Sequence, residues 1–264
     1  IKLNGVSVEE NLRAFSWGRV AYSEPDQLES LVGEPRKKVN SAKVSLDEFI
    51  ETRVADLKEY QNQVYADRFK VWVDKISKAE KKVGSNDREL EGAVARSLYK
   101  LMAYKDEYEV ARLYSSPVFS QKLNSQFSGK YTIGLNFAPP IFARKDPVTG
   151  NPKKSSYNGR WMFSALKVLA RFKFLRGTRF DPFGYHEDRR SERQLLDDYE
   201  QLLERFVKGL THDNLAIAIE LAKLPQGIRG YGYVKNRCIE EFKSKQDELN
   251  TQFSMPSRAM DAAE

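Results

Sequence analysis

Residues 45–84 read SLDEFIETRVADLKEYQNQVYADRFKVWVDKISKAEKKVG, and this stretch decides the fold. Its apolar residues recur at intervals of three and four, which is the spacing of one helical face. Ser45 and Glu48 form a capping-box pattern at the start, and Gly84 is a typical helix stop. Because the stretch is longer than most globular helices, we expect it to be broken or to pair with residues 87–104 as a helical hairpin.

A shorter helical pattern precedes it at residues 7–22. Ser7 and Glu10 predict a second capping box at its start. A polar, glycine- and proline-containing break at residues 33–41 interrupts the periodicity. We therefore expect a domain boundary in this break.

The middle of the chain favours strands over helices. Residues 131–133 and 135–137 predict short strands, and residues 146–152 carry the residues of a tight turn. Pro139 and Pro140 restrict such strands to an edge position, because proline has no amide to donate to a ladder. We expect a small β element here.

The C-terminal half returns to helical spacing, with each segment bounded by Gly, Pro or a capping residue. The predicted helices cover residues 161–176, 191–210, 213–224 and 233–253. The last ten residues have no periodicity, and we expect them to be disordered. The fold class is therefore mainly α, a helical domain with a long helical hairpin and a small β element in the middle.

Composition excludes several classes of protein. With 31% charged residues and a mean hydropathy of -0.62, the chain has no apolar run of the roughly 18 residues that suggest a membrane span. The single cysteine, Cys238, excludes a disulfide within the chain and a cysteine-ligated iron–sulfur cluster. His186 and His212 do not have metal-ligand spacing. We expect a cytoplasmic protein with no metal site.

The densest polar cluster lies at residues 176–190. His186 with Asp181 is a candidate base with an orienting carboxylate. The segment also offers cations for an anion: Arg176, Arg179, Arg189 and Arg190. A structural interpretation competes and is favoured, in which Asp181 starts a turn and Phe180 and Phe183 anchor the loop.

A second basic group flanks the predicted turn and would meet at its tip: Arg144, Lys145, Lys153 and Lys154. Such a tip suits a phosphate or an acidic partner. The plainer interpretation, a turn kept soluble by its lysines, is the favoured one.

A nucleic-acid interpretation has weak support. The net charge of +7 permits a polyanionic partner, and several aromatic residues at helical spacing suggest a stacking platform: Tyr99, Tyr104, Tyr108 and Tyr114. Such aromatics more often belong to a core. The glycine cluster at residues 227–232 lacks the context of a phosphate-binding loop, and we interpret it as a link between helices.

Several long blocks, in the same order, resemble the C-terminal portion of the 2-oxoacid:ferredoxin oxidoreductases, and most closely the fused-chain indolepyruvate ferredoxin oxidoreductases. These blocks are residues 1–15, 106–114, 137–147, 175–178, 181–185 and 228–235. The first resembles the end of a catalytic γ-type domain. The resemblance implies that residues 1–35 end that domain and form a linker, that residues 36–254 are a mainly helical accessory domain, and that residues 255–264 are a tail.

Enzymes of this family oxidatively decarboxylate 2-oxoacids, form an acyl-coenzyme A and reduce ferredoxin. They use thiamine diphosphate, magnesium and iron–sulfur clusters, but no cofactor motif falls within this sequence, so no catalytic residue is carried over. We expect a piece of a longer chain, because the sequence starts at Ile1 without an initiator Met.

Two hypotheses follow from the resemblance. In the first, the chain is an accessory domain that contacts other domains or subunits of the parent oxidoreductase and has no catalytic centre. In the second, its basic residues bind an anionic ligand, with coenzyme A as the main candidate.

Overall fold

The computed structural model describes residues 7–32, 44–127, 129, 133–137, 155–158, 160–230 and 233–254. The chain is mainly α-helical, as the sequence predicted. It divides into two compact units, Ile1–Ser45 and Leu46–Glu264. Within the described ranges, no helix is long and apolar enough to cross a membrane. The predicted turn and the C-terminal tail lie outside these ranges.

The first unit contains α1 (Val8–Ser23) and α2 (Pro25–Val32). Ser7 precedes α1 with a left-handed backbone, φ 45°, and its side chain makes no capping hydrogen bond. The predicted capping box at Ser7 is therefore wrong. A capping serine normally has an extended backbone, which aims its hydroxyl at the first amides of the helix. No residue of α1 is buried.

The second unit begins with the stretch that decided the fold. It forms α3 (Leu46–Tyr60) and α4 (Gln63–Lys82), so the long helix is broken at residues 61–62. Asn62 produces the break, because its extended backbone ends the helical path while its side chain accepts a hydrogen bond from the Tyr65 amide at 2.9 Å.

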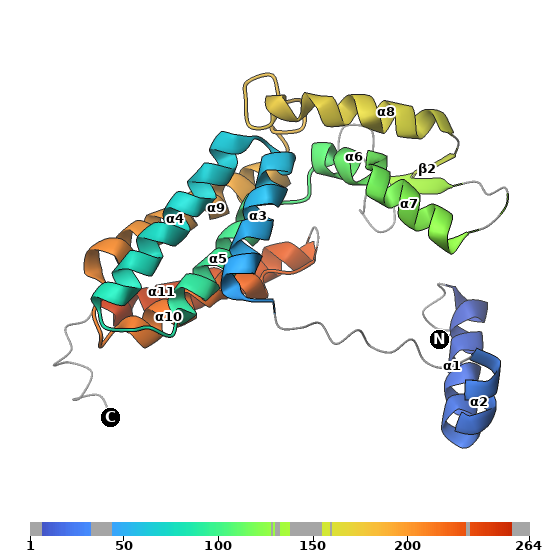
Figure 1. The fold of residues 1–264 in the computed structure, drawn as a ribbon, viewed down its shortest axis with the longest axis horizontal. Helices are drawn as coiled ribbons and strands as arrows, with labels where there is room; N and C mark the ends of the chain where they lie inside the picture. The colour runs from blue at the N-terminus through green and yellow to red at the C-terminus, as the bar shows by residue number, and fades with distance from the viewer. Residues whose placement is uncertain are drawn as a thin grey trace. The chain divides into compact units, whose positions relative to one another are not determined.

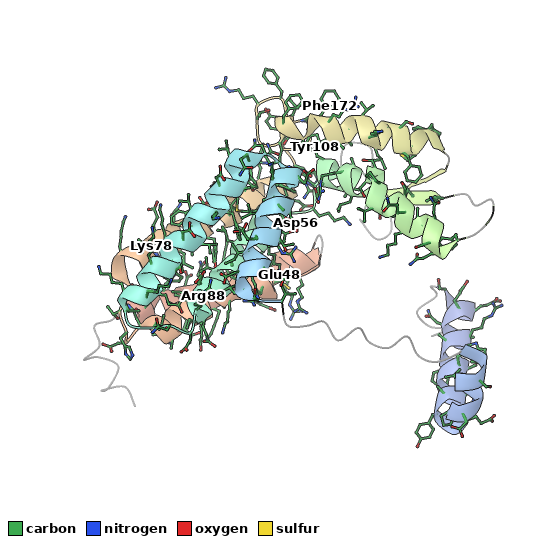
Figure 2. All side chains as sticks on the ribbon, in the orientation of Figure 1. Glu48, Asp56, Lys78, Arg88, Tyr108 and Phe172 are labelled. Carbon is green, nitrogen blue, oxygen red and sulfur yellow. The ribbon has the colours of Figure 1, made fainter. Side chains whose placement is uncertain are left out.

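The next helix, α5 (Glu89–Met102), packs on α4 and completes the predicted hairpin (Figure 1). Arg88 stands before it in the left-handed region and gives no side-chain cap. Glu80 of α4 takes this role, because its buried carboxylate accepts from the amides of Leu90 at 3.0 Å and Glu91 at 2.9 Å. Arg88, marked in Figure 2, instead binds Glu91 and Asp47.

The main core joins this hairpin to the C-terminal helices. These are α9 (Glu187–Gly209), α10 (Leu215–Lys223), the short 3-10 helix η3 (Leu224–Gly227) and α11 (Tyr233–Ser254). Phe69, Tyr199 and Phe206 are among its largest fully buried side chains. Such a residue contributes about 2 kcal/mol by leaving water. We call α3 to α5 with α9 to α11 the helical bundle.

The remaining elements form a separate layer with a small core of its own. They are α6 (Glu107–Ser115), α7 (Pro117–Gln126), β1 (Gly134–Phe137), β2 (Ser155–Asn158), α8 (Arg160–Arg171) and the 3-10 helix η2 (Phe172–Leu175). The strands are antiparallel, with Gly134 opposite Asn158, which confirms a small β element. Leu135, Met162 and Leu166 pack on Ala111 of α6. We call this layer the β-lobe.

The aromatic residues considered for nucleic-acid stacking belong mostly to the interior. Tyr104 and Tyr108 are buried, and Tyr99 packs against the main core. Tyr114 packs on the small core of the β-lobe and meets Phe119 edge to face at 5.1 Å. Buried rings offer no face to a base, so the core interpretation of these tyrosines holds.

Candidate functional site

A cluster of buried and half-buried polar side chains lies where the β-lobe meets the helical bundle. Four side chains form it, and we call it the joint: Asp106, Tyr108, Arg176 and Asp181. Asp106 stands between the bundle and α6, whereas Arg176 and Asp181 lie between η2 and α9. Hydrogen bonds between Arg176 and Asp106 and between Tyr108 and Asp181 therefore join residues about 70 positions apart in the sequence.

Arg176 is the central cation of the joint. Its side chain is only 6% exposed, and the partner carboxylate of Asp106 is 3% exposed. Nε and Nη2 donate to the two oxygens of Asp106 at 2.5 and 2.9 Å, the two-point geometry that suits an arginine and a carboxylate. Nη1 donates to the Tyr60 carbonyl and to Gln61 Oε1, each at 2.7 Å.

The guanidinium group also lies over an aromatic ring. Its central carbon is 3.7 Å from the centroid of the Tyr60 ring, a cation–π contact. Burial alone lowers the pKa of Arg176, but the hydrogen bonds and charge of Asp106 outweigh burial and the net shift is upward. Arg176 is therefore a permanent cation, fully occupied by partners within the chain.

Asp106 serves the local structure as well as the ion pair. It is the N-cap of α6, with an extended backbone and a side chain that accepts from the Glu109 amide at 2.8 Å. Aspartate is a preferred N-cap because its oxygen satisfies an amide that has no partner within the helix. One carboxylate thus starts α6 and holds Arg176.

Asp181 organises the loop that follows Arg176. Its buried carboxylate accepts from the amides of Gly177 at 2.9 Å and Phe183 at 3.1 Å, and from the Tyr108 hydroxyl at 3.1 Å. Gly184 packs so closely that an added Cβ would stand 2.7 Å from Asp181 Oδ2. The loop is therefore folded around a single carboxylate.

Tyr108 completes the joint from α6. Burial raises the pKa of its hydroxyl, and the charge of Asp181 raises it further. Its ring meets Phe183 edge to face, with centroids 5.3 Å apart. Tyr108 is thus a neutral hydrogen-bond donor that fixes the loop to the β-lobe. This arrangement matches the structural interpretation for Asp181 and Phe183, but Phe180 is 81% exposed and does not anchor the loop, so that part of the interpretation is wrong.

The structure places the other predicted site residues in different surroundings. His186 is the exposed N-cap of α9, and its Nδ1 accepts from the Asp188 amide at 3.3 Å, whereas the Asp181 carboxylate is engaged elsewhere. Arg189 is half-buried and pairs with Glu107 at 3.3 Å. Arg179 and Arg190 are exposed. The remaining four lie outside the described residues: Arg144, Lys145, Lys153 and Lys154.

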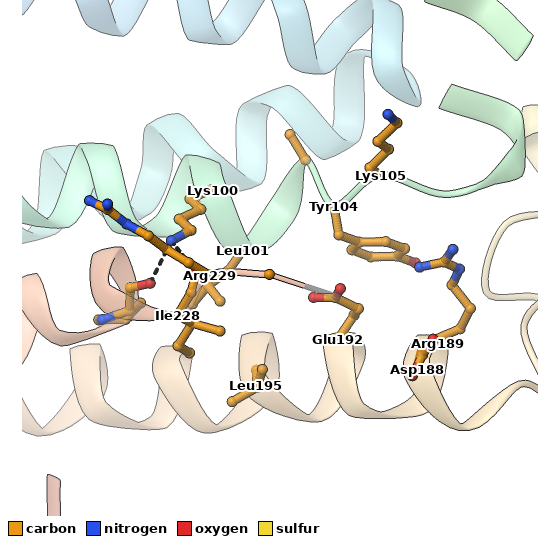
Figure 3. Close-up of a pocket in the computed structure, with 13 residues that line it drawn as sticks. Lys100, Leu101, Tyr104, Lys105, Asp188, Arg189, Glu192, Leu195, Ile228 and Arg229 are labelled. Carbon is orange, nitrogen blue, oxygen red and sulfur yellow. Dashed lines mark hydrogen bonds between the residues drawn. The ribbon is translucent and has the colours of Figure 1, made fainter. Parts of the chain in front are cut away.

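A pocket with a cavity volume of about 290 Å³ lies beside the joint. It opens between the end of α5, the first turns of α9 and the loop after η3. Figure 3 shows Tyr104 and Arg189 close together at one end and Lys100, Ile228 and Arg229 at the other. Its cations come from three separate segments: Lys100, Lys105, Arg189 and Arg229. Asp188 and Glu192 contribute acids.

Lys100 has a mainly structural position in this pocket. Its Nζ donates to the carbonyls of Pro225 at 3.0 Å, Gln226 at 2.9 Å and Ile228 at 2.6 Å. It therefore holds the loop after η3 in place, which confirms residues 227–230 as a link between helices.

Arg189, at the other end of the pocket, is a paired cation. Burial lowers the pKa of Arg189, but its partner Glu107 shifts that pKa upward overall.

Sequence reasoning identified Arg189 but missed the other pocket cations. The glycine cluster at residues 227–232 marked the loop, yet nothing in the local pattern connects Lys100 or Lys105 with Arg229. Only folding brings residues more than 120 positions apart to one cavity. Among the residues that the structure describes, no group of three or more His, Cys, Asp or Glu side chains is arranged to hold a metal ion.

Comparison with known proteins gives one match. Residues 46–248 match the sequence model of a family of unknown function, DUF6537. The match begins at the first residue of α3 and covers the β-lobe and all of the helical bundle except the last six residues of α11. No curated protein sequence and no solved structure significantly matches the chain.

Proposed function

We propose that this chain, which belongs to the DUF6537 family, is a helical accessory domain of a thiamine diphosphate-dependent 2-oxoacid ferredoxin oxidoreductase of the indolepyruvate type. In this proposal the domain is cytoplasmic. It contacts other domains or subunits of the enzyme and has no catalytic centre of its own. Thiamine diphosphate, magnesium and the iron–sulfur clusters belong to the rest of the enzyme, as does the docking of ferredoxin.

The joint is the observation that carries this proposal. Three of the blocks that resemble the oxidoreductases, residues 106–114, 175–178 and 181–185, are far apart in sequence. They meet in the contacts of Asp106 with Arg176 and of Asp181 with Tyr108. These side chains are buried and bind one another. Residues held in this way support a structural role for the segments that carry the resemblance.

The test compares the full-length protein, meaning the whole parent chain that is proposed to carry this domain, with a form of it that ends before Leu46. Both are assayed for oxidation of indolepyruvate with coenzyme A and a ferredoxin or dye acceptor, and their assembly is measured by light scattering. The proposal expects activity in the full-length protein and a loss of assembly, with reduced activity, in the shortened one. A full-length protein that neither binds thiamine diphosphate nor oxidises a 2-oxoacid would contradict it.

The pocket favours a second candidate, an anion-binding module of the same enzyme. Its cations surround a cavity near the lower end of the usual range for small-molecule sites. That size suits a diphosphate more than a whole coenzyme A. Isothermal titration with coenzyme A tests it, using Lys105→Ala with Arg229→Ala as the variant and Arg190→Ala as the control. Unchanged affinity in the double variant would exclude the pocket.

A further inference from the structure

Helix α8 has apolar residues on two faces, and only one face is covered by the described structure. Met162 and Leu166 are buried against α6 and β1. A second set follows the spacing i, i+4, i+7 and i+11 and is exposed: Trp161, Ala165 and Val168 of α8, and Phe172, the first residue of η2. Trp161 is 61% exposed, Val168 54% and Phe172 44%. We call this set the α8 stripe.

Helical geometry makes the α8 stripe a single straight ridge. At about 100° per residue Trp161, Ala165 and Val168 fall within about 60° of one another, and at 1.5 Å per residue they span about 10 Å. Phe172 follows at the start of η2. The centre of the stripe lies roughly 100° around the helix from the buried face. A helix that is apolar over so wide an arc is normally covered on both sides.

A stripe of polar residues borders the α8 stripe on the side away from α6. Ser164, Lys167 and Arg171 lie there and are exposed. Phe172, the first residue of η2 (labelled in Figure 2), has its ring centroid 6.0 Å from that of Phe174, which is 62% exposed and continues the apolar surface along η2. The surface thus has an apolar ridge and a cationic edge on one side.

Acidic residues are almost absent from this part of the sequence. Between Glu109 and Asp181 the chain has thirteen lysines and arginines and one acidic residue, Asp146. The charge of the whole chain is +7, so the rest of the chain is slightly acidic and the excess of cations belongs to the β-lobe segment. At the exposed face of α8 the described cations are Lys167 and Arg171, and they favour a partner that brings negative charge.

We propose that the α8 stripe is a docking surface for an acidic amphipathic helix, one with an apolar ridge bordered by Asp or Glu. A ridge with this spacing fits the groove between the side chains of another helix. The carboxylates of the partner lie beside Lys167 and Arg171. Under the proposed function, on which this part rests, the helix belongs to the parent oxidoreductase.

Other occupants fit the surface less well. A second copy that packed stripe to stripe would bring the two basic edges together if the helices ran antiparallel, and would offer neither edge a row of acids if they ran parallel. Nucleic acid stacks on aromatic faces, but the centre of the stripe is aliphatic, with Ala165 and Val168. A lipid surface suits a helix with cations on both borders of its apolar stripe, and here one border is the face covered by α6.

The test places a photocrosslinker at the surface of the full-length protein. Phe172 is replaced by p-benzoylphenylalanine, the assembled protein is irradiated, and the attached peptide is identified by mass spectrometry. The expected product is a peptide from a predicted helix with apolar residues bordered by Asp or Glu. Its yield should fall at least about fivefold in the variant Lys167→Glu with Arg171→Glu, and also in 1 M salt.

Two controls make the outcome decisive. The same crosslinker at Val207, which is 41% exposed on α9, should not attach to that peptide. Circular dichroism of the charge variant verifies that its exposed substitutions leave the helices intact. The inference is overturned by the absence of a crosslink, or by one to α8 of a second copy, to lipid, to nucleic acid or to a segment without acids.

The outcome also separates this inference from the proposed function. A crosslink to an acidic helix in a protein without 2-oxoacid oxidoreductase activity would keep the docking surface and remove the proposed function. An active, assembled oxidoreductase with no crosslink at position 172 would keep the proposed function and overturn the docking surface.

Discussion

Arg176 makes four hydrogen bonds from one buried guanidinium group, so its loss should be severe. Arg176→Met leaves Asp106 buried without a cation, and we expect the free energy of unfolding to fall by about 3–5 kcal/mol. Chemical unfolding followed by circular dichroism measures it. The control is Arg179→Met, three residues away and exposed, which should change stability by less than about 0.5 kcal/mol. Similar values for the two variants would contradict this role.

Glu91 should make stability depend on acid. Burial raises its pKa, but hydrogen bonds from Arg88 and Ser77 reverse this effect, so the pKa lies below the ordinary 4.5. A carboxyl group whose pKa is lowered in the folded state stabilises the fold at pH values above its ordinary pKa. This stabilisation is lost as the pH falls from the ordinary pKa through the lowered one.

The measurement is the free energy of unfolding from pH 6 to pH 3. We expect its decline below about pH 4.5 to be flatter in Glu91→Gln than in the natural chain. Arg88→Gln should flatten the curve as well, because it removes the cation that favours the charged carboxylate. Identical slopes in all three proteins would show that this pair does not contribute.

Single residues show how far sequence reasoning reaches at this scale. Asp181 was identified as a turn residue, because turn chemistry acts over a few positions. The partner of Arg176 was not identified, since Asp106 is 70 residues away and any acid would satisfy the same rule. A turn can therefore be predicted from the neighbouring residues, whereas a pair of residues that are distant in the sequence cannot.

Among the elements, α5 depends on a cap supplied by its neighbour. Both oxygens of Glu80 accept amides at its first turn. Because hydrogen bonds to a charged group contribute about 1.5–3 kcal/mol each, Glu80→Ala should destabilise the chain by at least about 2 kcal/mol. Glu80→Gln, which keeps one acceptor, should cost less. Thermal unfolding of both variants checks the order, and a Gln variant as unstable as the Ala variant would contradict it.

Helix periodicity was the most reliable signal for elements. The helices α9, α10 and α11 begin and end within about four residues of their predicted limits, because their apolar spacing is unambiguous. The break between α3 and α4 was not located in advance, since apolar spacing continues on both sides of Asn62. The cap at Ser7 failed because a capping pattern does not determine the backbone conformation of its first residue.

At the scale of the whole molecule, the second unit should fold without the first. A chain of residues 44–254 keeps both cores intact, and we expect its Tm to lie within about 3 °C of that of the full 264 residues. Differential scanning calorimetry of the two chains measures this. A drop of more than about 10 °C would show that the first unit stabilises the second.

The net charge of the whole chain does not show how the charges are distributed along the sequence. A net charge of +7 suggested a mildly basic surface, but averaging over the chain hid the nearly acid-free segment between Glu109 and Asp181. A window of that length applied to the sequence would have found it. The exposed side of α8 was beyond sequence reasoning, since periodicity shows that a helix has apolar faces but not which face is covered.

The ion pair of the joint lies between two helix ends, and this fixes its polarity. Arg176 donates to the carbonyl of Tyr60, the last residue of α3, where the helix macrodipole is negative. Asp106 begins α6, where the macrodipole is positive. Each charge is thus stabilised by a helix dipole as well as by its partner. The exchange Arg176→Asp with Asp106→Arg would keep an ion pair but oppose both dipoles, so it should not restore stability.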